Sequence, residues 1–187
     1  MQRNQKGILF SQVGYDLKQK KRTFIRGPEN WLSDDAEIVI TDADGKVKYK
    51  SKTKYRGRFW GIYWWGADFT EFKETGTYKI KLYDKNKLLL EDGGLTIGEN
   101  VLFEKTVRYI GPENLKRRAI FAGVKPGWFD AGSLWQEVPS HSVMIAGLCD
   151  LCDFTGDLLE PEDKKAVLSF INDGCIYLGM CQDKAAE

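Results

Sequence analysis

The chain has 187 residues, and its 28 Lys and Arg residues against 27 Asp and Glu residues give a net charge of +1 at pH 7. This balance excludes the electrostatic footprint of a protein that binds nucleic acid or an anionic membrane, and no run approaches the roughly 20 apolar residues of a membrane span. Aromatic residues make up 13 % of the chain and include six tryptophans. The composition therefore favours a globular protein with neutral partners on which tryptophan can stack.

The first structural signal is a β-hairpin near residue 40. Residues 37–41 and 46–51 read as short strands on either side of residues 42–45. The Asp44-Gly45 pair in this turn tolerates the positive φ that a tight hairpin needs, so a hairpin is predicted here. The Asp42-x-Asp44 spacing also resembles the start of a calcium loop, but no bidentate Glu follows at the required distance, so no calcium is expected.

The alternation continues up to about residue 98. Residues 76–83 place apolar and polar side chains alternately, which predicts a strand with one buried face. A second hairpin is predicted from residues 87–91 and 94–98 around the turn Asp92-Gly93-Gly94. Short strands with turn signals every ~8–12 residues are typical of an immunoglobulin-like β-sandwich, which we predict for residues 1–98.

Residues 59–65 form the richest aromatic run, Phe-Trp-Gly-Ile-Tyr-Trp-Trp. One interpretation makes Trp60, Trp64 and Trp65 a platform that binds carbohydrate. Alternate residues of one strand face opposite sides, so all three cannot line one surface. The pattern therefore favours a strand whose side chains are divided between the sandwich core and the helical part.

From residue 99 to residue 187 the apolar spacing becomes helical. A short helix is predicted over residues 101–110, ended by Gly111-Pro112. Two longer helices, over about 139–154 and from Pro161 onward, are predicted to form an antiparallel hairpin joined by residues 155–157. Both have wide apolar stripes that two helices cannot cover, so we expect a missing carboxyl-terminal part of the protein or another subunit to cover them.

The four cysteines lie in the last third of the chain, at positions 149, 152, 175 and 181. Zinc sites place a Cys-x-x-Cys pair in a glycine-rich turn, whereas Cys149 and Cys152 stand in a helical run. No thioredoxin-like pattern surrounds the pair either. We therefore expect four buried, unpaired cysteines, with no metal and no cofactor.

The first ten residues lack the apolar core of a signal peptide. The chain as written therefore carries no export signal. A mature secreted protein looks the same once its signal is removed, so a secreted or periplasmic location is expected only if a signal peptide was removed.

Three segments, in order, resemble the amino-terminal part of glycoside hydrolase family nine, the inverting cellulases. Residues 8–25 contain the Ser-Gln-Val-Gly-Tyr signature, residues 67–82 contain Asp-Phe-Thr and Gly-Thr-Tyr, and residues 127–133 read Gly-Trp-Phe-Asp-Ala-Gly-Ser. The resemblance implies a cellulase-type immunoglobulin-like domain followed by the first helices of an incomplete (α/α)6 barrel. It also implies the hydrolysis of a β-linked glucan or a related polysaccharide.

The resemblance assigns two candidate catalytic positions. Asp130 matches the first aspartate of the family motif, whose second aspartate is usually the base, and here Ser133 replaces that second aspartate. Inverting hydrolysis needs an acid and a base roughly 6.5–9.5 Å apart. A serine hydroxyl positions water but cannot take its proton at neutral pH. Asp130 is therefore expected to position the water or act as the base, and the chain alone is expected to be inactive, with the acid beyond Glu187.

Candidate substrate-binding residues flank this loop. Trp128 and Trp135 either stack on sugar or pack under the loop, and both interpretations stay open. His141, the only histidine, is favoured as a helix-start residue over a catalytic base, because no charge partner is evident. The alternative function is a non-catalytic immunoglobulin-like module that binds carbohydrate or supports a neighbouring domain.

Overall fold

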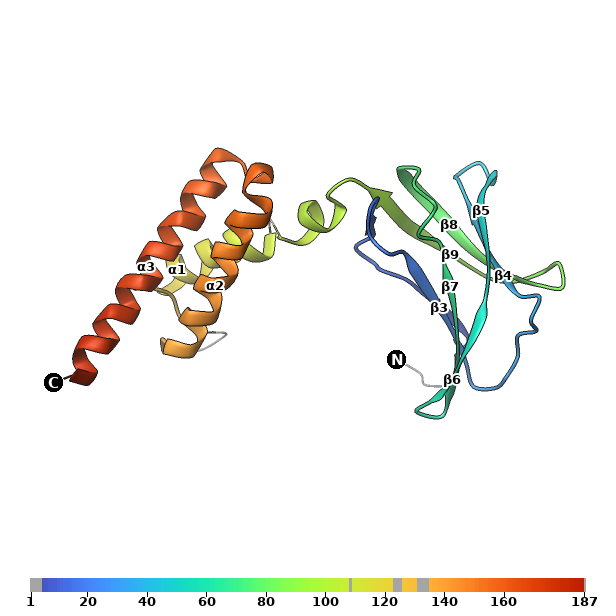
Figure 1. Ribbon diagram of the computed structural model, residues 1–187, viewed down its shortest axis with the longest axis horizontal. Helices are drawn as coiled ribbons and strands as arrows, with labels where there is room; N and C mark the ends of the chain where they lie inside the picture. Colours follow the sequence, from blue (N-terminus) through green and yellow to red (C-terminus); the bar gives the residue numbers. More distant parts are fainter. Residues whose placement is uncertain (1–4, 108, 123–125, 131–134, 187) are drawn as a thin grey trace. The chain divides into compact units, whose positions relative to one another are not determined.

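The computed structural model describes residues 5–107, 109–122, 126–130 and 135–186 (Figure 1). The chain divides into two compact units, residues 1–104 and 105–187. The first unit is a β-sandwich of two sheets, and the second carries three α-helices. The last strand ends at Gly98, where the sequence analysis places the end of the sandwich, and residues up to 104 still belong to the first unit.

The sandwich contains one four-stranded and one five-stranded sheet. Neighbouring strands are antiparallel except for β2 and β9, which pair in parallel. The four-stranded sheet has the order β1 (Gly7–Leu9), β3 (Arg22–Gly27), β7 (Ile62–Asp68) and β6 (Lys54–Phe59). The five-stranded sheet has the order β2 (Tyr15–Asp16), β9 (Lys87–Gly98), β8 (Gly76–Asp84), β4 (Glu37–Thr41) and β5 (Val47–Lys52).

The core of the sandwich is formed by the inward-facing residues of both sheets. Ile25 of the four-stranded sheet and Ile40, Ile80 and Leu95 of the five-stranded sheet have no exposed surface. Their neighbours along each strand point outward, as the period of two requires. The alternation in the sequence therefore predicted the sandwich correctly.

The hairpin of β4 and β5 is confirmed. The two strands pair antiparallel, and the backbone N–H of Lys46 donates to the Asp42 carboxylate at 2.9 Å across the turn. Gly45 adopts φ +83°, the left-handed conformation that the Asp-Gly pair was expected to supply.

The second predicted hairpin is wrong. Residues 87–98 form a single strand, β9, and the hairpin turn precedes it at Lys85 and Asn86, with φ of +48° and +64°. The glycines at 93 and 94 instead lie where the register between β8 and β9 shifts, and Gly94 has φ +81°. The glycines allow β9 to hold one residue more than β8 at this point, which is a β-bulge. The strand continues because β8 pairs with β9 on both sides of the bulge.

The aromatic run 59–65 is a hairpin and not one strand. β6 ends at Phe59, Trp60 and Gly61 form the turn with φ of +51° and +79°, and β7 begins at Ile62. Trp60 at the tip is 91 % exposed, whereas Trp65 lies in the sandwich core. The tryptophans of this run therefore do not form one platform.

Irregular helical turns follow the sandwich. Two five-residue segments with π-helical hydrogen bonding, η1 (Phe103–Val107) and η2 (Tyr109–Glu113), precede α1 (Asn114–Ala122). The predicted end of the helix at Gly111-Pro112 is wrong. Pro112 lies inside η2, and the helical backbone continues past it into α1.

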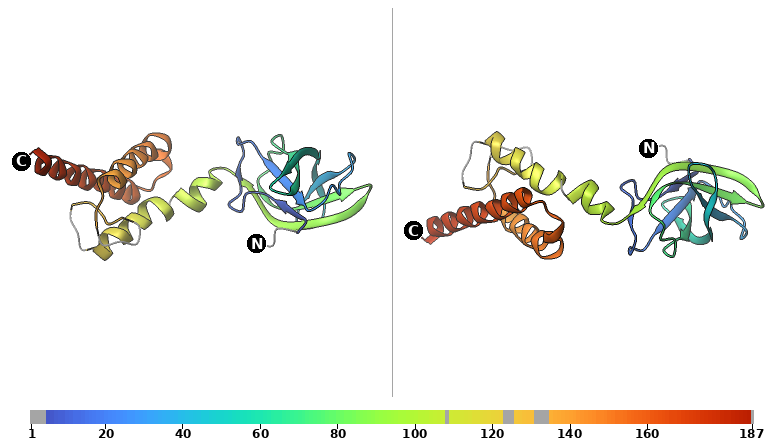
Figure 2. Two further views of the ribbon diagram at one scale, coloured as in Figure 1. Left: turned by 90° about the horizontal axis from the view of Figure 1, so that it is seen from below. Right: turned by 90° about the horizontal axis from the view of Figure 1, so that it is seen from above.

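The predicted helical hairpin is confirmed. α2 (Val138–Thr155) and α3 (Pro161–Ala186) pack against one another, joined through the short turn η3 (Gly156–Leu158) (Figure 2). Pro161 begins α3, and its first turn contains Glu162 and Asp163, which suit the positive end of a helix dipole. Among the helices of the described residues, none is long and apolar enough to cross a membrane.

Candidate functional site

Asp130 lies in the segment that follows α1 and is fixed there by two contacts. Its backbone N–H donates to the carbonyl of Trp135 at 3.0 Å, and the Nη2 atom of Arg118, on α1, lies 3.6 Å from its Oδ1. The guanidinium of Arg118 also donates to the carbonyl of Phe129, through Nε at 2.9 Å and through Nη2. About a third of the Asp130 side chain (32 %) is exposed, so water reaches the carboxylate.

An aromatic stack lies beside this segment. The ring of His141, on α2, is sandwiched between Trp128 and Tyr177, with centroid distances of 4.4 and 4.1 Å. Trp128 and His141 have no exposed surface. Because Tyr177 belongs to α3 and Trp128 to the Asp130 segment, the stack connects that segment to both long helices.

The hydrogen bonds of His141 define its protonation. Its Nδ1 lies 2.7 Å from the carbonyl oxygen of Glu137, which can only accept, so Nδ1 carries the proton. Its Nε2 then accepts the backbone N–H of Trp128 at 3.2 Å. Burial lowers the pKa of His141, the Glu137 carbonyl opposes that effect, and the charge of Arg118 lowers the pKa further. His141 is therefore a neutral residue with both ring nitrogens engaged, which anchors Trp128.

Two glycines make room for this arrangement. Gly127 has φ +89°, and a Cβ atom there would lie 2.6 Å from Nε2 of His141. Gly174, on α3, leaves the space that Trp128 fills, since a Cβ atom there would lie 2.8 Å from Cη2 of that indole. Sequence reasoning missed the role of Gly174, although a glycine inside a helical pattern is a usable signal of close packing.

Of the other predicted site residues, Trp135 lies at the surface. Trp135 is 60 % exposed, and its indole N–H donates to the Glu137 carboxylate at 2.6 Å, which holds both side chains at the surface. Ser133 lies outside the described residues. Trp128, Trp135 and His141 stay predictions as substrate-binding residues, and of these three Trp135 presents a ring that a sugar can reach. Sequence reasoning missed Arg118 and Tyr177 altogether.

No metal site appears in the described part of the chain, where no three His, Cys, Asp or Glu side chains are grouped to hold an ion. The cysteines are free thiols. The expectation that all four are buried is wrong. Cys149 and Cys175 are exposed, and Cys152 and Cys181 are half-buried, because the helix faces that carry them are not fully covered by the described chain.

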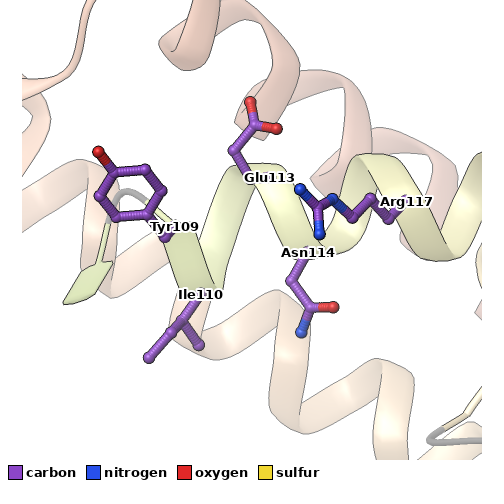
Figure 3. Close-up of a pocket in the computed structure, with 5 residues that line it drawn as sticks. All are labelled: Tyr109, Ile110, Glu113, Asn114 and Arg117. Carbon is purple, nitrogen blue, oxygen red and sulfur yellow. The ribbon is translucent and has the colours of Figure 1, made fainter. Parts of the chain in front are cut away.

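A separate hollow lies on η2 and α1. Its volume is about 460 Å³, and Tyr109 and Ile110, both well exposed, lie on one side of it (Figure 3). Glu113, Asn114 and Arg117 complete its lining. Glu113 is already paired with Lys116, with 3.3 Å between the charged atoms, so this hollow presents an apolar surface with few free polar groups.

Comparison with known proteins identifies the first unit. Residues 3–87 match the family model described as the cellulase N-terminal ig-like domain. A search of curated proteins finds no match. The matched residues include β1 to β8, so the sandwich is a cellulase N-terminal ig-like domain, and helices follow it. The match ends well before Asp130.

Proposed function

We propose that the chain is the amino-terminal portion of a cellulase-like, inverting glycoside hydrolase that acts on a β-linked glucan or a related polysaccharide. The observation that carries the proposal is the position of Asp130, which is fixed by Arg118 and by the Trp135 carbonyl yet remains open to water. The cellulase-type domain at residues 3–87 supports a polysaccharide as the substrate class.

In this proposal Asp130 acts on the attacking water. An inverting enzyme needs a carboxylate that accepts the proton of this water, with a carboxylic acid roughly 6.5–9.5 Å away on the other side of the glycosidic bond. Arg118 orients the Asp130 carboxylate, and Trp135 offers a ring for the sugar. Ser133, which stands in the sequence where the family motif has its second aspartate, cannot take the proton of this water, since a hydroxyl has no accessible basic form at neutral pH.

The remaining parts of the site are supplied from outside residues 1–187 in this proposal. The acid comes from a carboxyl group of a carboxyl-terminal barrel region. The same region, or another subunit, covers the apolar side chains that the helical unit leaves exposed, among them Val143, Phe154 and Leu168. We therefore propose that residues 1–187 alone are inactive.

Reducing-end release and calorimetry with cellohexaose test this proposal on the purified chain. We expect the unchanged chain to bind cellohexaose weakly and the Trp135→Ala variant not to bind it. We expect the unchanged chain to hydrolyse cellohexaose no faster than the Asp130→Asn variant does. Tyr109→Ala is the matched control, because Tyr109 is as exposed as Trp135 but lines the other hollow. Hydrolysis that Asp130→Asn abolishes would contradict the inactivity, and binding unaffected by Trp135→Ala would contradict the site.

A second candidate function is that of a non-catalytic immunoglobulin-like module that binds carbohydrate. It is favoured by Trp60, whose indole is 91 % exposed at the tip of a sandwich hairpin. Glycan binding that is lost with Trp60→Ala and kept with Asp130→Asn would favour this module over the Asp130 site.

A further inference from the structure

The outer face of the four-stranded sheet contains a hollow of about 390 Å³. Phe24 and Phe59 line it and are 44 % and 51 % exposed. Gly66 also lines it, between the strands that carry the two rings. Hollows of about 300–1,000 Å³ are the usual size of ligand sites.

Strand register and glycine build this hollow. Gly66 of β7 lies directly opposite Phe24 of β3, and the register of β6 shifts between Tyr55 and Gly57, which leaves Arg56 as the extra residue of a bulge. A Cβ atom at Gly66 would lie 3.1 Å from Nε of Arg56 and 3.7 Å from Cδ1 of Phe24. The Arg56 side chain and the Phe24 ring therefore both border the space above Gly66, a residue that has no side chain.

The second ring is supported in the same way. A Cβ atom at Gly57 would lie 3.1 Å from the ring of Phe59, so that ring leans over the glycine. The ring centroid of Trp60 lies 6.5 Å from that of Phe59, which extends the aromatic surface to the hairpin tip. Trp60 has φ +51°, a conformation that a bulky residue rarely adopts, and such outliers cluster at functional positions.

This face carries more arginine side chains than carboxylates that pair with them. Arg22, Arg26 and Arg56 lie on it, and only Arg22 has an ion pair within the described residues, with Asp68 at 3.2 Å. The Nε atom of Arg26 is buried and has no hydrogen-bond partner among the described residues. Guanidinium groups with unused donors are the preferred partners of carboxylates, which they bind through two parallel hydrogen bonds.

We propose that this face binds a glycan that carries carboxylate groups, such as a uronic-acid polymer. A uronate ring meets both requirements of the surface, because its C–H face stacks on Phe24 or Phe59 while its carboxylate reaches Arg56. The site deepens the second proposed function, the carbohydrate-binding module, and it is independent of Asp130. Unlike a site for a neutral glucan, this site needs Arg56, because Arg56 binds the carboxylate.

Titration calorimetry of the whole chain tests the proposal with three probes: a hexamer of galacturonic acid, cellohexaose and a single-stranded dT oligomer. We expect the acidic hexamer to bind at least tenfold more tightly than either of the others, and to bind more weakly as salt rises. Phe59→Ala and Arg56→Gln should each weaken its binding at least tenfold. Circular dichroism of each variant establishes that the sandwich is folded.

Arg58→Gln is the matched control for charge. Arg58 is on the same strand as Arg56, but its guanidinium lies over the ring of Tyr63, 5.4 Å from the centroid, on the opposite side of the sheet. The affinity of the Arg58→Gln variant for the acidic hexamer should stay within twofold of the affinity of the unchanged chain. Equal losses in Arg56→Gln and Arg58→Gln would overturn the proposal, as would equal affinity for the dT oligomer.

The outcomes separate this proposal from the module function on which it rests. If cellohexaose binds as tightly as the acidic hexamer, and still does so in the Arg56→Gln variant, the acidic-glycan site is overturned but the carbohydrate-binding module is not. If the folded chain binds neither glycan, both the acidic-glycan site and the carbohydrate-binding module are overturned. Asp130→Asn should change none of these affinities.

Discussion

The substitution Gly127→Ala tests how the Asp130 segment is held. Gly127 has φ +89°, and an added Cβ atom would lie 2.6 Å from Nε2 of His141. That nitrogen is the acceptor for the backbone N–H of Trp128. The added methyl group therefore introduces backbone strain and also displaces the ring that holds the next residue.

The cost has two parts. A left-handed conformation costs a residue other than glycine about 1–2 kcal/mol. A buried N–H that loses its acceptor costs about 1–3 kcal/mol. The two effects involve the same atoms and partly overlap, so we expect the helical unit to lose about 2–4 kcal/mol of unfolding free energy. For a unit of this size each kcal/mol shifts the melting temperature by about 4–8 °C, so the expected decrease is at least about 8 °C.

Thermal melting followed by circular dichroism at 222 nm measures the helical transition. Gly179→Ala is the matched control, since Gly179 lies in α3, is exposed, and a Cβ atom there would meet no described atom within 4 Å. That change should stabilise the helix by about 0.5–1 kcal/mol. If Gly127→Ala melts at the temperature of the unchanged chain while Gly179→Ala melts higher, the reasoning about His141 and Trp128 is refuted.

Three further predictions concern other positions. Gly174→Ala brings a methyl group within 2.8 Å of the Trp128 indole, so it should cost about 1–3 kcal/mol by overpacking and shift tryptophan fluorescence. Gly94→Ala should destabilise the sandwich by about 1–2 kcal/mol in urea unfolding because φ is +81°, whereas Gly93→Ala should change stability by less than half as much. Burial lowers the folded-state pKa of His141, so below the unfolded-state pKa of about 6.5 the unfolded chain binds more protons. The contribution of His141 is therefore complete above about pH 6.5 and is lost as pH falls from there through the folded-state pKa. Urea unfolding of His141→Gln should show a smaller decrease between pH 7.5 and 5 than that of the unchanged chain, and equal decreases would contradict this.

Local patterns in the sequence predicted the fold where they agreed with the long-range pairing. The period of two predicted the sandwich, and Asp44-Gly45 predicted the β4–β5 turn. At residues 92–94 the local glycine signal suggested a turn, but pairing with β8 on both sides keeps β9 continuous. The true turn at Lys85 and Asn86 has a weaker signal, because only Asn is a frequent residue in left-handed positions.

The candidate site was predictable only in part. Its loop and Asp130 stand out in the sequence because the motif is local. Arg118 and Tyr177, which hold the segment and the stack, come from α1 and α3, and no periodicity indicates which side chain of a helix meets a distant loop. The hollow beside Arg56 was equally hidden, since it depends on the register between three strands.

The bulge at Arg56 also has a consequence for the behaviour of the chain in solution. β6 stands at the end of its sheet, so its outer backbone groups are a template on which another strand can add. A bulge interrupts the regular spacing of that template, and the charges of Lys54, Arg56 and Arg58 repel a second copy of the same strand. The irregularity that positions Arg56 thus also protects an exposed sheet edge from aggregation.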